Sequence, residues 1–141
     1  MNYLTERILR IIHGGLSRSA TEGGEPIPPF ECASREAIDA LIKLPQTSFF
    51  GFEQYPSVEE KAAIIFYTVN KKHLFENGNK RMSVYCFLMF LAINNYDFNA
   101  DSDELTKKAL WLASTTHEDD FGEIKQSLSR WIASHLHKLE S

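Results

Sequence analysis

The sequence predicts an all-α fold, one compact helical domain over residues 1–141 with one small β-hairpin. The first observation behind this prediction is that apolar residues recur at the three- and four-residue spacing of an amphipathic helix along most of the chain. The second is that a polar cap followed three residues later by glutamate, the signature of a helix start, occurs three times. These pairs are Ser57 with Glu60, Asp101 with Glu104, and Asp120 with Glu123.

The expected helices follow one another along the whole chain. They are Tyr3 to His13, Ser34 to Leu44, Val58 to Lys72, Lys80 to Asn95, Asp101 to Ser114 and Asp120 to Leu136. The first is expected to end at Gly14 and Gly15, because glycine commonly follows the last helical residue. Residues 14–29 contain four of the seven glycines and three of the five prolines, so the sequence predicts a long loop there.

Two segments differ from the ordinary amphipathic pattern. Residues 80–95 are apolar on almost every helical face, which is typical of a helix buried on all sides, so we expect this helix at the centre of the fold. Phe49, Phe50 and Phe52 form a short β-prone run in which Gly51 is available for a turn. This run either forms a small hairpin within residues 46–55 or fills the core between two helices.

Composition excludes several classes of protein. A net charge of −4 lacks the excess of lysine and arginine that a general nucleic-acid binder needs. The longest apolar run, Val84 to Ile93, has ten residues, whereas a membrane-spanning helix needs about 20. Charged residues interrupt the N-terminal apolar pattern, so no secretory signal is predicted. Cys32 and Cys86 have no paired spacing and are expected to be free thiols, with a bridge between them as the alternative. We expect a cytoplasmic protein with no nucleic-acid or membrane partner.

One short segment concentrates positive charge. Lys71, Lys72, Lys80 and Arg81 lie within eleven residues of this acidic chain. The residues from Gly78 onward lead directly into the apolar helix, and the free N–H groups of a helix N-terminus bind phosphate. Cations in a first helical turn are unfavourable by roughly 0.3–1 kcal/mol each, so an anion between them and the helix explains their presence. The alternative is an ordinary solvated loop.

His73 lies beside this expected anion site. A neutral imidazole takes a proton from a hydroxyl group near pH 7, which typically accelerates a reaction by about 10²- to 10⁴-fold. The alternative is that His73 only stabilises the C-terminal end of a helix. Other groupings are weaker: His135 and His137 diverge on a helix, and the acidic residues up to Asp120 are better explained as a helix cap.

The string from His73 to Arg81, HLFENGNKR, resembles the signature of the Fic/Doc family, HxFx[D/E][G/A]N[G/K]R. In that family the signature also lies between two helices, the second strongly apolar. The similarity in architecture extends from Tyr3 to Leu136. The resemblance implies a compact Fic-type helical domain that transfers part of a nucleotide to a protein hydroxyl.

The resemblance also implies residue roles. His73 would be the general base and Phe75 the residue that anchors the loop in the core. Gly78 and Asn79 would hold the phosphates of ATP or another nucleoside triphosphate, and Arg81 would neutralise their charge.

The residue at position 80, Lys80, bears on which part of the nucleotide is transferred. Family members with glycine at this position typically transfer AMP. Doc members have lysine and transfer the terminal phosphate to elongation factor Tu, so the resemblance favours phosphate transfer to a serine or threonine hydroxyl, with AMP transfer as the alternative.

Asn77 departs from the family pattern, which has a carboxylate there to hold Mg²⁺. Asn77 would offer only an amide oxygen, and Glu76 would act through a water, so Mg²⁺ binding should be weak. A catalytically degenerate member that binds a nucleotide or a protein is the second alternative.

Two further features follow from the resemblance. The family has a short hairpin near the active site that docks the protein target by strand addition. The matching stretch here is Thr47, Ser48, Phe49, Phe50, Gly51, Phe52 and Glu53. Many relatives also carry an inhibitory [S/T]xxxE[G/N] helix, which is not matched here, so a separate antitoxin-like partner is expected.

Overall fold

The computed structural model describes residues 1–20, 27–72, 74–75, 78–116 and 118–139, with only the backbone of residues 19 and 20. These residues form six α-helices and two short antiparallel strand pairs, which confirms the predicted all-α fold class. The helices are α1 (Glu6–Ala20), α2 (Arg35–Lys43), α3 (Val58–Lys71), α4 (Asn79–Ile93), α5 (Ser102–Ser114) and α6 (Phe121–His135). Two 3₁₀ turns, Phe30–Cys32 and Leu44–Gln46, precede and follow α2.

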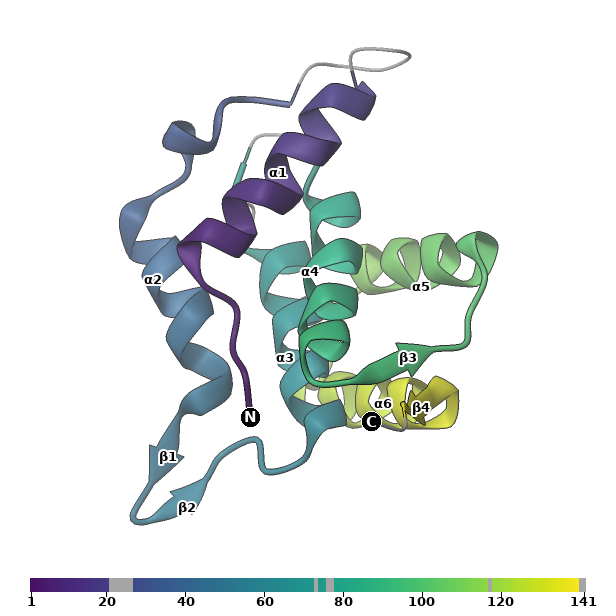
Figure 1. Ribbon diagram of the computed structural model, residues 1–141. Coiled ribbons are helices and arrows are strands. Elements are labelled where there is room, and N and C mark those ends of the chain that lie inside the picture. The colour runs from purple at the N-terminus through teal and green to yellow at the C-terminus, as the bar shows by residue number, and fades with distance from the viewer. Residues whose placement is uncertain (21–26, 73, 76–77, 117, 140–141) are drawn as a thin grey trace.

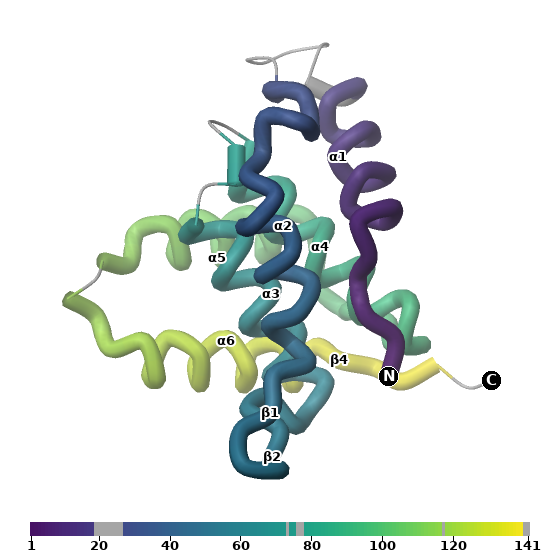
Figure 2. The backbone as a smooth tube through the Cα atoms, turned by 90° about the vertical axis from the view of Figure 1, so that its left-hand side faces the viewer, coloured from purple at the N-terminus to yellow at the C-terminus, as the bar shows by residue number. Residues whose placement is uncertain are grey.

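Helices α3 and α4 form the centre of the molecule. In Figure 1, α1 and α2 lie on one side of this pair and α5 and α6 on the other, and Figure 2 shows the same arrangement after a quarter turn. Helix α3 packs against α4, α6 and α5, and α4 packs against α5 and α1. The rings of Phe66 on α3 and Phe87 on α4 stack with centroids 4.7 Å apart, and both side chains are fully buried.

Four predicted helix starts are confirmed by their caps, whereas the first helix begins at Glu6 rather than at Tyr3. In five helices the side chain of the residue before the helix accepts a hydrogen bond from a first-turn N–H, which satisfies one of the otherwise unpaired donors. The capping residues are Thr5 for α1, Ser34 for α2, Ser57 for α3, Asp101 for α5 and Asp120 for α6. The interpretation of Asp120 as a helix cap is therefore confirmed.

The predicted end of the first helix is wrong. Helix α1 begins at Glu6 and continues through Gly14 and Gly15 to Ala20, so residues 14–20 are not part of a loop. Two glycines cost a helix roughly 0.5–1 kcal/mol each relative to alanine. Leu16 continues the apolar stripe of α1 and is 6% exposed, and burying a leucine contributes about 1.5–3 kcal/mol, which offsets most or all of that cost.

Helix α4 is central, as predicted, but it is not buried on all sides. Cys86, Phe87 and Phe90 are fully buried, whereas Tyr85 is 51% exposed. Its outward face, which includes Val84, borders a cavity that is also lined by residues of α5. The apolar composition of this helix therefore has two causes, a buried core face and an open apolar cavity wall.

The predicted hairpin is confirmed. Strands β1 (Ser48–Phe49) and β2 (Phe52–Glu53) pair antiparallel. The turn residues Phe50 and Gly51 both have positive φ, 50° and 81°, as two-residue hairpin turns of type I′ require. The rings of Phe49, Phe50 and Phe52 are 69%, 88% and 78% exposed, so the alternative that they fill the core is wrong.

A second strand pair was not predicted: β3 (Tyr96–Phe98) pairs with β4 (Leu136–Lys138) and joins the segment after α4 to the segment after α6. Cys32 and Cys86 are free, as predicted. Among the described residues, no helix is both long enough and apolar enough to span a membrane.

Candidate nucleotide site

The signature residues lie where α3 ends and α4 begins. Three of the predicted site residues, His73, Glu76 and Asn77, fall outside the residues that the structure describes. The described part of this segment, Leu74 and Phe75 followed by Gly78 and the first turn of α4, is called the motif loop below.

Phe75 is 4% exposed and lies in the core. Its backbone is held by the side chain of Asn79, which accepts a hydrogen bond from the Phe75 N–H at 3.1 Å and donates one to the Phe75 carbonyl at 2.6 Å. Asn79 is itself 6% exposed. Its amide therefore closes the motif loop, and contact with a phosphate at this position would come from the backbone N–H.

Gly78 is the residue before α4 and has φ of 81°, a left-handed conformation that favours glycine. A Cβ at this position would lie 3.0 Å from Cδ1 and 3.1 Å from Cγ1 of Ile27. The backbone conformation and the close approach of Ile27 therefore both favour glycine here.

The N-terminus of α4 differs from those of the five capped helices. Its N-cap residue Gly78 has no side chain, so among the described residues no capping oxygen offsets the positive end of the helix dipole. Lys80 and Arg81 are exposed in this first turn. No ion pair between described residues includes either of them.

Lys71 has a different role. Its ammonium donates to the carbonyls of Leu112 at 3.3 Å and Thr115 at 2.5 Å, at the C-terminal end of α5. Cations are favourable at this end of a helix. Lys71 therefore ties α3 to α5, and the free positive charge of the segment lies mainly on Lys72, Lys80 and Arg81.

A cavity of about 790 Å³ adjoins the start of α4. One end is formed by Gly78–Arg81 together with Lys71. The remaining wall is mostly apolar and includes Val84, Tyr85 and Leu88 from α4 and Leu105, Ala109 and Leu110 from α5. Small-molecule sites in proteins are typically about 300–1,000 Å³, mostly apolar, with a few polar groups that fix orientation. A basic end and an apolar wall match a molecule with an anionic tail and a flat apolar ring system.

The hairpin does not lie beside the motif loop, so that part of the expectation is wrong. It precedes α3, and the motif loop follows α3, so the 14 residues of this helix separate them by roughly 20 Å. Figures 1 and 2 both place β1 and β2 at the end of α3 that is distant from the start of α4. The segment that does contact the motif loop is the one that contains Ile27.

The described residues contain no group of three or more histidine, cysteine, aspartate or glutamate side chains that would hold a metal ion. His135 lies 2.9 Å from a carboxylate oxygen of Glu104 and ties α6 to α5. His137 lies on β4, so these two histidines belong to different elements.

Three residues that support the motif loop were not predicted from the sequence, namely His13, Ile27 and Phe30. The ring of His13 lies 4.8 Å from that of Phe75, and the ring of Phe30 lies 6.2 Å from it. His13 follows Ile12 on the apolar stripe of α1, a position that often signals burial, but no local pattern indicates which residue such a side chain contacts.

Comparison with known proteins assigns the family. A family model described as the Fic/DOC family matches residues 3–91, which is well over half of the chain. Over 97 residues, covering 69% of this chain and 75% of the relative, the sequence is 29% identical to a protein named Toxin Doc from Mycolicibacterium smegmatis. The matched region contains α1, the motif loop and most of α4, including the basic end of the cavity. The chain therefore belongs to the Fic/DOC family.

Proposed function

We propose that this protein transfers the terminal phosphate of ATP, or of another nucleoside triphosphate, to a serine or threonine hydroxyl of a protein target. The observation that carries this proposal is the cavity whose basic end is the uncapped N-terminus of α4. Membership of a family of nucleotide-dependent transferases supports it.

The polyphosphate would lie over Gly78–Arg81. Backbone N–H groups in the first turn of α4 would donate to phosphate oxygens, and Lys80 and Arg81 would balance the charge. The base would lie against the apolar wall, where Tyr85 offers an exposed ring for stacking.

The proposed chemistry uses His73 as the general base. His73 accepts the proton of the target hydroxyl, whose oxygen then forms a bond to the γ-phosphorus. The bond from that phosphorus to the β–γ bridging oxygen breaks, and the nucleoside diphosphate leaves. Lys80 and Arg81 neutralise the charge that develops on the leaving group.

Mg²⁺ supplies charge neutralisation to nucleotide phosphates when it is bound. Glu76 and Asn77 are the proposed contacts, and the replacement of the family carboxylate by Asn77 leaves fewer anionic oxygens to hold the ion. This substitution favours a second candidate function, a degenerate member that binds a nucleotide or protein without transfer.

We also propose two protein partners. Because the sequence resembles Doc and its relative is named a toxin, we propose a translation protein such as elongation factor Tu as the target and a separate antitoxin as the inhibitor. The exposed rings of the hairpin, residues 47–53, are a proposed contact for the target at some distance from the reacting hydroxyl.

The test is to incubate the purified protein with a bacterial lysate and ATP labelled at the γ or the α phosphate. We expect one labelled protein band from γ-labelled ATP only, and no band with His73→Ala. His137→Ala is the matched control, since this exposed histidine lies on β4, and it should retain full labelling.

Other outcomes are equally informative. Label from the α phosphate would replace phosphate transfer by AMP transfer. If the wild-type chain transfers neither label but Asn77→Asp restores transfer, the natural protein is a degenerate member that binds a nucleotide or a protein without catalysis.

A further inference from the structure

We infer that His13 is a positioning residue for the motif loop, which it holds through Phe75 from a helix outside the signature. This inference rests on the proposed nucleotide site for its functional consequence. Its structural content, that His13 keeps the motif loop in place, stands independently of which ligand binds there.

His13 is almost completely buried on α1, at 6% exposure. Its Nε2 lies 2.8 Å from the carbonyl oxygen of Pro28. A carbonyl oxygen can only accept, so Nε2 carries the hydrogen and donates it. This bond ties α1 to the segment Ile27–Cys32, which is called the strap below.

The ring of His13 also contacts the motif loop. It lies 4.8 Å from the ring of Phe75, tilted by 36°, and 5.7 Å from the ring of Phe30 in an edge-to-face arrangement. Phe30 and Phe75 are 6.2 Å apart, so the three rings form one cluster. His13 is therefore bonded to the strap through its nitrogen and packed on the motif loop through its ring.

The strap contacts the motif loop at two points. Ile27 lies within 3.0 Å of the position that a Cβ of residue 78 would take, and Phe30 packs against Phe75. These points flank the carbonyl of Pro28, to which His13 is bonded. Removing the imidazole therefore releases the middle of the strap and one face of Phe75 together.

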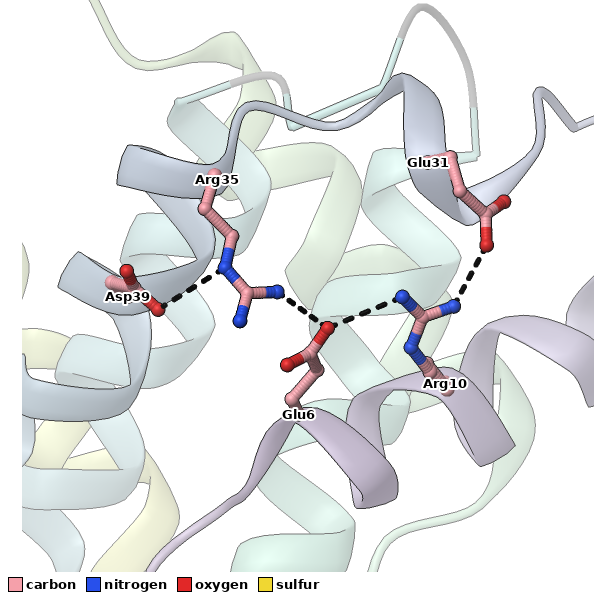
Figure 3. Close-up of polar contacts among 5 residues, drawn as sticks. All are labelled: Glu6, Arg10, Glu31, Arg35 and Asp39. Atoms are coloured by element: carbon pink, nitrogen blue, oxygen red, sulfur yellow. Dashed lines mark hydrogen bonds and ion pairs between the residues drawn. The ribbon is translucent and has the colours of Figure 1, made fainter.

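A second layer of contacts ties α1 to the strap and α2 on the surface (Figure 3). Arg10 pairs with Glu31 at 2.8 Å, and Glu6 pairs with both Arg10 and Arg35. These side chains are exposed or partly exposed, and ion pairs near the surface are weak and screened by salt. We therefore expect the buried contact through His13 to contribute more to holding the motif loop than these surface ion pairs do.

The experiment uses three substitutions that separate the two functions of the imidazole. His13→Ala removes the ring and the donor, His13→Phe keeps an aromatic ring, and His13→Gln keeps a donor near the position of Nε2. Leu128→Ala, in a fully buried position on α6, is the control for general destabilisation. The readouts are ATP affinity by calorimetry and hydrogen exchange of the Phe75 amide, which donates to Asn79.

We expect His13→Ala to weaken ATP binding by about fivefold or more and to accelerate exchange at Phe75. His13→Phe should recover most of both readouts, and His13→Gln less. Leu128→Ala should lower the thermal midpoint of unfolding without a specific change in ATP affinity or in hydrogen exchange at Phe75. The inference is overturned if His13→Ala affects both readouts no more than Leu128→Ala does. If the wild-type chain binds no nucleotide, the proposed function fails, and exchange at Phe75 still decides the role of His13.

Discussion

The motif loop and the hairpin lie at opposite ends of α3 and use the same residue type in opposite ways. Phe75 in the motif loop is 4% exposed, whereas Phe50 at the hairpin tip is 88% exposed. The motif loop is held by interior packing from α1, the strap and Asn79. The hairpin is anchored to the core by hydrogen bonds from one buried cation, Lys61. The difference indicates that changes in the motif loop alter stability and ligand binding together, whereas changes at the hairpin tip alter only what the surface can bind.

Lys61 is 2% exposed, an unusual burial for lysine. Its ammonium donates to the carbonyl of Pro45 before the hairpin, to the carbonyl of Tyr55 after it, and to the carboxylate of Glu53 on β2. A single side chain on α3 therefore joins both stems of the hairpin to the core.

The largest effect is expected for Phe75→Ala. Removing a buried phenylalanine typically costs about 3–5 kcal/mol of unfolding free energy, because a cavity remains. The measurement is urea unfolding. Phe50→Ala is the matched control and should change stability by less than about 0.5 kcal/mol, as is usual for exposed positions. Equal costs for the two substitutions would contradict the contrast between the two regions.

The next largest effect is expected for Lys61→Met, which keeps the aliphatic stem and removes the charge. It leaves two buried carbonyls without their donor, at about 1–3 kcal/mol for each unsatisfied group. Faster hydrogen exchange at the Gln54 amide, which bonds to the Thr47 carbonyl, would report loosening of the hairpin.

Glu53→Gln is the control for Lys61→Met. The side chain of Glu53 is 53% exposed, so this change should have a small effect. A loss of stability with Glu53→Gln as large as with Lys61→Met would show that the ion pair, rather than the backbone carbonyls, holds the hairpin.

Gly78→Ala separates backbone strain from crowding. A left-handed conformation costs a residue with a Cβ roughly 1–2 kcal/mol. Gly51 on the hairpin has the same φ of 81° with open space around it, so Gly51→Ala should show the backbone cost alone. Gly78→Ala should lower the free energy of unfolding by more than Gly51→Ala does, since Ile27 must move. It should also weaken ATP binding.

The addition of Ile27→Ala tests whether Ile27 causes the larger loss of unfolding free energy in Gly78→Ala. In the double variant this loss should be smaller, and a double-mutant cycle measures the difference as a coupling free energy. A coupling of zero would show that the strap does not restrict the motif loop at residue 78.

The smallest effect concerns pH and the surface charges of Figure 3. A hydrogen bond from Arg35 holds the pKa of the Glu6 carboxyl below its usual value of 4.5, and a hydrogen bond from Arg10 does the same for Glu31. A lowered pKa in the folded state stabilises the protein above pH 4.5, and this contribution is lost as the pH falls through the lowered values.

Urea unfolding at about pH 7 and about pH 3 measures this contribution. The double variant Glu6→Gln, Glu31→Gln should lose less stability on acidification than the wild-type chain. An identical loss in the two proteins would show that these carboxyls do not contribute.

The sequence predicted the helix starts and the hairpin because their signals are local. Caps such as Ser57 and Asp101 act within one turn of a helix, and Gly51 sets a turn within two residues. The continuation of α1 through Gly14 was not predictable in this way, since the energy that offsets the glycines comes from packing of Leu16 against other parts of the chain. The pairing of β3 with β4 likewise joins segments about 40 residues apart and has no turn signal.

For the candidate site, the sequence predicted that Gly78 and Arg81 lie at the start of α4 but not what supports them. Their location follows from local position, since Gly78 directly precedes the apolar helix and Arg81 lies in its first turn. Contact between His13 and Phe75 joins residues 62 positions apart and depends on how α1 crosses α4, which no local pattern specifies. The hairpin was expected near the motif loop, and this expectation failed for the same reason. Its position relative to the motif loop depends on the length and direction of α3, which no local pattern specifies.

A calorimetric titration of ATP into the wild-type chain and into Arg81→Ala tests the phosphate site directly. We expect saturable ATP binding that Arg81→Ala weakens and that inorganic triphosphate competes for, because the basic end of the cavity is proposed to hold the polyphosphate. Absence of heat with the wild-type chain, or equal affinity in the two proteins, would contradict the assignment of the α4 N-terminus as the phosphate site.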